Sequence, residues 1–256
     1  MNSLVQVSLV TFKELLRERT LHGLLVIFFL MSLFSLLLGQ LSFAEQIKMS
    51  LDFGLSIMHI SMVGLSILLG SQLIHREIER KTIFTLLVRP LSRTQYLFGK
   101  FFGLWVLMFF TAFVCAMFLS FCLLYFGAFY FFEVFLSAFG TWIECGFLIA
   151  LMSLLDQKLR PPVAVFCGFA LFLIGHWFET LEHFVEKSPG GVLFYLHQFL
   201  SGAFPNLETW NWRTLVVYQE FLTPEDFGRS VITGFLWIFV YLFLASFLFE
   251  RRDLVA

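Results

Sequence analysis

The run from Phe101 to Phe132 contains no charged side chain and constrains this chain more than any other feature. As one α-helix it would be about 48 Å long, whereas the hydrocarbon core of a bilayer is roughly 30 Å thick. We therefore end a membrane span near Leu124 and expect a turn around Gly127. Only 14% of the residues are charged, against about 25% in soluble domains. The sequence predicts an all-α polytopic membrane protein.

The apolar runs predict six transmembrane helices in one membrane domain, residues 1–256, with no internal repeat. The predicted spans cover residues 21–41, 53–74, 101–124, 135–155, 163–178 and 230–249. Two long connections join them: a basic loop at 75–100 and a large, acidic external loop at 179–229. The four cysteines contain no C-x-x-C pair and are interpreted as buried free thiols.

The distribution of basic residues predicts the orientation. With six spans, 13 of the 17 Lys and Arg residues fall on one side, and loops rich in these residues stay in the cytoplasm. Both termini are therefore predicted to be cytoplasmic. Residues 3–20 form a predicted amphipathic helix at the cytoplasmic surface of the membrane. Its apolar face consists of Val5, Leu9, Phe12 and Leu16.

The loop at 75–100 has a predicted structure of its own. A short amphipathic helix is indicated by the i, i+3, i+4 spacing of Ile83, Leu86 and Leu87. Pro90 ends this helix, and Ser92 with Gln95 forms a predicted capping box at the start of the next one. A short amphipathic helix at the cytoplasmic end of a helical hairpin suits docking into another protein.

The same loop carries a family resemblance. Its motifs are Glu79-Arg80-Lys81-Thr82, Leu86-Leu87, Arg89-Pro90, Ser92-Arg93 and Gly99-Lys100. In this order, before a membrane span, they resemble the first cytoplasmic loop of ABC-2-type transporter permeases. Lys81 departs from the family, which often has Gly there. The segments Phe204–Asn211 and Phe249–Leu254 also resemble family segments, so the resemblance covers the whole chain.

The resemblance implies an ABCG-like exporter fold in which residues 3–20 are the connecting helix. It implies that the loop is a coupling helix that docks into a separate ABC ATPase subunit, with ATP-Mg bound there and no cofactor on this chain. The expected interface consists of Glu77, Glu79, Arg80, Lys81, Thr82, Thr85, Leu86, Leu87, Arg89, Pro90, Ser92 and Arg93. A second copy, or a homologous permease, would complete a multi-pass transporter in a bacterial inner membrane. Nothing indicates a nucleic-acid partner.

Two alternatives remain open: a basic loop without a partner, and a non-transporting scaffold or signal relay moved by an ATPase. Catalysis by this chain is not expected. Gly99-Lys100 is followed by Phe101, so it fails the Walker A pattern. No span carries paired aspartates, or a Gly-x-Ser with a membrane His, as an intramembrane protease requires.

Glu144 is the only charged residue well inside a predicted span. It is interpreted either as a polar contact in the transport path or as a protonated carboxyl bonded to a neighbouring helix. His59, predicted about two turns inside span two, could line an exit cavity or simply pack. A separate group near the end of span five contains His176, Glu179, Glu182, His183 and Glu186. This group could bind a metal, but we favour a solvated acidic helix face and predict no metal site.

Overall fold

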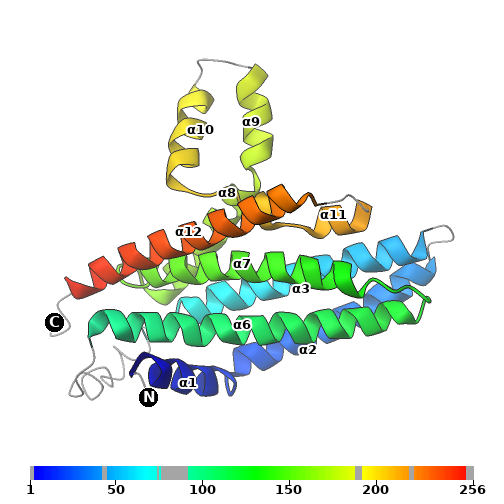
Figure 1. The fold of residues 1–256 in the computed structure, drawn as a ribbon, viewed down its shortest axis with the longest axis horizontal. Helices are drawn as coiled ribbons and strands as arrows, with labels where there is room; N and C mark the ends of the chain where they lie inside the picture. The colour runs from blue at the N-terminus through cyan, green and yellow to red at the C-terminus, as the bar shows by residue number, and fades with distance from the viewer. Residues whose placement is uncertain are drawn as a thin grey trace.

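A computed structural model describes residues 3–41, 45–73, 75, 92–187, 192–218 and 222–251. Within these ranges the chain is built from helices joined by short turns (Figure 1). The long helices are α2 (Arg19–Leu41), α3 (Gln46–Gly70), α6 (Arg93–Leu124), α7 (Phe131–Leu155) and α12 (Pro224–Glu250). The shorter elements are α1 (Ser3–Leu15), α8 (Pro161–His176), α9 (Phe178–Lys187), α10 (Val192–Ala203), η1 (Leu207–Trp210) and α11 (Arg213–Tyr218).

Five of these helices, α2, α3, α6, α7 and α12, are long and apolar enough to cross a bilayer. The fifth predicted span corresponds to α8, which has 16 residues. At 1.5 Å per residue α8 is about 24 Å long, less than the thickness of the hydrocarbon core. The all-helical membrane architecture is therefore present, while a sixth full crossing stays a prediction.

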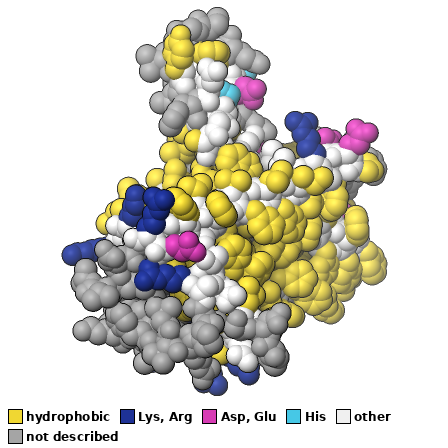
Figure 2. Space-filling model, turned by 60° about the vertical axis from the view of Figure 1, so that its left-hand side comes forward, with side chains coloured by type: hydrophobic (Ala, Val, Ile, Leu, Met, Phe, Trp, Pro, Cys, Tyr) yellow, Lys and Arg dark blue, Asp and Glu magenta, His cyan; other side chains and the backbone are white. Residues whose placement is uncertain are grey.

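The long helices form an inner and an outer group. Most of α3 and α7 is buried, whereas less than a third of α2 and of α12 is buried. The exposed side chains of the outer helices are large and apolar, among them Leu30 and Phe34 on α2 and Phe239 and Phe243 on α12. Figure 2 shows the result, a broad apolar face with charged side chains gathered toward the ends of the bundle. Such a face is suited to lipid.

Two local signals in the sequence are confirmed. The Ser92 hydroxyl accepts a hydrogen bond from the Gln95 N–H, and the Gln95 side chain accepts one from the Ser92 N–H, which completes the capping box of α6. At its other end α6 stops at Leu124. Gly127 follows with a φ of +72°, and its N–H donates to the Leu124 carbonyl. This left-handed glycine ends the helix and turns the chain.

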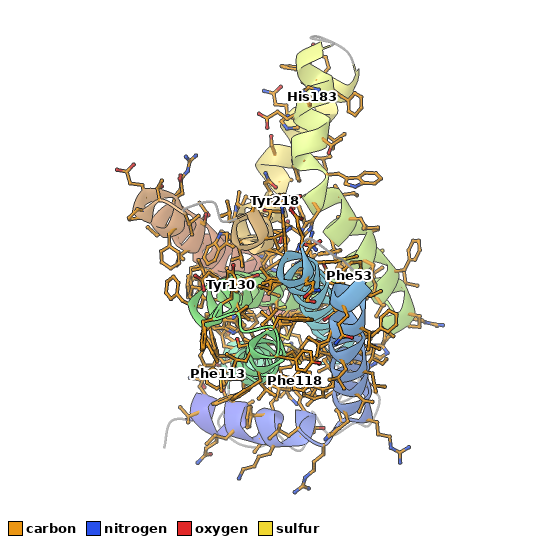
Figure 3. The ribbon with its side chains drawn as sticks, turned by 90° about the vertical axis from the view of Figure 1, so that its right-hand side faces the viewer. Phe53, Phe113, Phe118, Tyr130, His183 and Tyr218 are labelled. Carbon is orange, nitrogen blue, oxygen red and sulfur yellow. The ribbon has the colours of Figure 1, made fainter. Side chains whose placement is uncertain are left out.

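The segment 179–229, predicted as one large loop, contains four helical elements in its described part. Helices α9 and α10 form a hairpin that projects from the side of the bundle (Figures 1 and 3). The short helix η1 instead packs into the bundle, where Leu207 and Trp210 are buried. The sequence lacks the long periodic pattern that would predict such short elements.

Helix α1 packs obliquely against the first half of α6. Contact is close because Gly99 and Gly103 have no side chain: a Cβ on Gly103 would lie 2.7 Å from the Ser8 carbonyl oxygen. Thr11 and Leu15 are buried in this contact. Of the predicted apolar face, Val5, Leu9 and Leu16 remain exposed, so that face is free to meet lipid.

Candidate functional site

The described residues on either side of the predicted coupling helix, in the loop at 75–100, are attached to other helices. We call these attachments the two loop anchors. Most of the predicted interface lies outside the described residues. These positions are Glu77, Glu79, Arg80, Lys81, Thr82, Thr85, Leu86, Leu87, Arg89 and Pro90. The anchors therefore define how the loop connects to the membrane domain.

The first loop anchor joins His75 to Asp156, the residue that caps the C-terminus of α7. The backbone N–H of His75 donates to Asp156 Oδ2 over 3.1 Å, and His75 Nδ1 lies 3.9 Å from Oδ1. Asp156 is buried. Next to it, the Gln157 side chain donates to the Ala245 carbonyl over 2.7 Å and so ties the same turn to α12.

The second loop anchor joins the start of α6 to the end of α12. Arg93 Nη1 donates to the Glu250 carbonyl over 3.1 Å, and the Thr94 hydroxyl donates to Glu250 Oε1 over 2.6 Å. The arginine thereby satisfies a carbonyl at a helix C-terminus. One turn further in, the rings of Tyr96 and Phe249 stack with centroids 6.2 Å apart.

Helix α1 reaches the same end of the bundle. Lys100 on α6 is buried and its Nζ lies 3.6 Å from Glu14 Oε2 on α1. Helix α1, the start of α6 and the end of α12 therefore lie together at one end (Figure 1). The two anchors thus connect residues beside the loop to α7 through Asp156 and to α12 through Glu250.

A second candidate site lies in the interior. His59 on α3 and Glu144 on α7, predicted separately, are brought together: His59 Nε2 and Glu144 Oε2 are 2.7 Å apart. His176 at the end of α8 lies 3.6 Å from Glu144 Oε1 and 3.7 Å from Glu208 Oε2 on η1, measured from its Nε2. We call these four residues the histidine–glutamate cluster. Glu144 is fully buried within it.

The sequence did not predict the membership of this cluster. His176 was grouped with Glu182 and His183, but those two side chains are exposed on α9, where Figure 3 labels His183 on the projecting hairpin. His59 also lies deeper than predicted, because α3 begins at Gln46 and not at residue 53. Glu208 stood in a motif with no assigned role, and only the packing of η1 brings it to His176.

A comparison with protein families gives the identity of the fold. Residues 7–174 match the model described as ABC-2 family transporter protein, which is well over half of the 256-residue chain. The chain belongs to the ABC-2 transporter family. As an ABC-2 protein it is a membrane component of a transporter, and members of this family typically pair with an ABC ATPase. No curated protein matches this ABC-2 chain.

The matched region of this ABC-2 protein includes α2, α3, α6 and α7, most of α1 and α8, the loop at 75–100 and the first loop anchor. It also includes His59 and Glu144. His176, Glu208 and the Glu250 side of the second anchor lie beyond the match. The family match thus covers the first four long helices and leaves the segments after α8 to be understood from their own contacts.

Proposed function

We propose that this chain is the permease subunit of an ABC exporter, with a separate ATPase docked on the loop at 75–100. The observation that carries the proposal is the pair of loop anchors. Residues on both sides of the predicted coupling helix are attached to α7 and α12, so the loop is held at its two ends by the helices that it would have to move.

In this proposal, ATP-Mg binds to the ATPase, and closure of the ATPase displaces the loop. Leu86 and Leu87 provide the apolar contact, worth about 1.5–3 kcal/mol for each side chain if fully buried. The charged residues around them orient the contact and contribute little each. Displacement then passes through His75 and Asp156 to α7, and through Arg93, Thr94 and Glu250 to α12.

The proposed complex contains two permease subunits and two ATPase subunits in a bacterial inner membrane. A single subunit exposes large apolar side chains on its outer helices. A second copy can cover part of this apolar surface. Native mass spectrometry from mild detergent tests the composition. A monodisperse permease that carries no ATPase would contradict it.

The decisive test replaces Leu86 and Leu87 together by Asp. The expected result is loss of the ATPase from the purified complex while the membrane domain keeps its thermal stability. The matched control is Leu30→Asp with Leu37→Asp, which changes two exposed leucines on α2, away from the loop; this pair should not release the ATPase from folded protein. Retention of the ATPase by the Leu86 and Leu87 variant would contradict the proposal.

ATP-dependent flux separates an exporter from an ATPase-driven relay. Inverted membrane vesicles that contain the complex should accumulate substrate when ATP is added, because the cytoplasmic side then faces the medium. A relay would hydrolyse ATP without moving any solute. Comparison of candidate solutes in this assay also assigns the substrate class.

A further inference from the structure

We propose that the histidine–glutamate cluster binds one divalent transition-metal ion of the zinc class. His59, Glu144 and His176 are the ligands, and Glu208 is the fourth ligand from η1. The ligand atoms of the first three already lie within 4.8 Å of one another. Two imidazoles with one or two carboxylates are a ligand set that zinc and related ions prefer.

Two polar atoms in the cluster lack hydrogen-bond partners among the described residues: Glu144 Oε1 and His176 Nε2. They face each other across 3.6 Å, which is too long for a good hydrogen bond. A water bonded to both would hold them about 4.5 Å apart. A tetrahedral metal with bonds of about 2.1 Å would hold them about 3.4 Å apart. The observed distance fits the metal best.

Charge also favours a dication. A lone carboxylate in an apolar interior is expensive, and Glu144 is fully buried among α3, α7 and α8. With neutral imidazoles, a dication between Glu144 and Glu208 makes a cluster with no net charge. The 2.7 Å contact between His59 and Glu144 has to open by less than about 1 Å to admit the ion.

An ion has a route to this position. Glu208 lines a cavity of about 620 Å³, which is also lined by Asn206, Asp226 and Arg229. Since Glu208 Oε2 is 3.7 Å from His176 Nε2, this carboxylate connects the cavity to the buried ligands. Bound metal would hold η1 against α3, α7 and α8. Metal binding at this cluster does not require a docked ATPase.

The test uses the purified full-length chain, stripped with a chelator and titrated with Zn²⁺ against a chromophoric indicator. The wild type should bind one Zn²⁺ per chain and unfold at a higher temperature with Zn²⁺ present. Glu144→Gln and His176→Ala should each weaken Zn²⁺ binding by at least about 100-fold. Loss of a residue that only hydrogen-bonds to a metal ligand already lowers metal affinity by up to about that factor. The matched control, His183→Ala on the exposed face of α9, should bind like the wild type.

Substitution with Co²⁺ gives a second readout, because a visible absorption band reports nitrogen and oxygen ligands directly. The band should appear in the wild type and in His183→Ala and be absent in His176→Ala. If Glu144→Gln fails to fold, His176→Ala still tests the proposal. His176 lies at the end of α8 and its side chain is 16% exposed, so its replacement disturbs the core less than replacement of the fully buried Glu144. Wild-type protein that binds no Zn²⁺, or Zn²⁺ binding that survives in folded His176→Ala, overturns the proposal and leaves a hydrogen-bonded cluster without metal.

Discussion

Glu144 combines complete burial with a contact to a neighbouring helix, because its Oε2 lies 2.7 Å from His59 Nε2. The sequence left two interpretations of this residue, a contact in the transport path and a carboxyl bonded to another helix. The second is realised in the structure as a bond between α7 and α3. A role in the path stays a prediction, since the same carboxyl also faces His176 near the cavity beside η1.

Replacement of Glu144 by Leu should lower the free energy of unfolding by about 1–3 kcal/mol, because the His59 nitrogen loses its buried partner. Glu144→Gln keeps an acceptor and should cost less. Combining Glu144→Leu with His59→Leu should recover part of the loss, since neither polar group then remains. Thermal unfolding in detergent measures these changes, with the exposed Glu182→Leu as control. Equal stability of all four variants would contradict this account.

At the scale of helices, the contact between α1 and α6 depends on two glycines. A Cβ on Gly103 meets the Ser8 carbonyl oxygen and Thr11 Cβ, each at 2.7 Å, and backbone cannot move aside as a flexible side chain can. Gly103→Val should therefore separate α1 from α6 at a cost of about 1–3 kcal/mol. Trypsin should then cut at Lys13 and Arg17 faster than in the wild type. Gly228→Ala, which meets nothing within 4 Å, is the control and should leave the rate unchanged.

The second loop anchor allows a test of coupling at the same scale. Glu250→Ala removes the acceptor of the Thr94 hydroxyl. Since one net hydrogen bond is worth about 0.5–1.5 kcal/mol, ATP-dependent transport should fall by about two- to tenfold while the ATPase stays bound. Glu225→Ala at the opposite end of α12 is the matched control. Unchanged transport in Glu250→Ala would show that this anchor carries no motion.

Local signals predicted the elements whose ends are set by their own residues. The capping box at Ser92 and the turn at Gly127 depend on neighbours within a few positions, so the sequence was sufficient. The loop anchors and the histidine–glutamate cluster join residues far apart in the chain. His176 and Glu208 acquire their roles only because α8 is short and η1 packs back into the bundle, which no periodic pattern encodes.

For the whole molecule, the orientation in the membrane is the prediction with the widest consequences. In a Cys167→Ser background, whose other three cysteines are buried, Ser92→Cys should react with an impermeant maleimide only after the cytoplasmic side is opened. Glu225→Cys should react from outside, because the two positions lie at opposite ends of the bundle (Figure 1). Labelling of Ser92→Cys in intact cells would contradict the predicted topology and place the loop at 75–100 outside the cytoplasm.

The convergence of α1, Arg93 and Glu250 at one end has a practical consequence for reporter design. A fluorescent protein or affinity tag fused behind α12 stands beside the loop that is proposed to receive the ATPase, and a bulky tag before α1 stands there too. Either fusion can weaken complex formation without any change in the permease itself. A short peptide tag, compared at both ends, is therefore the safer label for measuring how this subunit assembles.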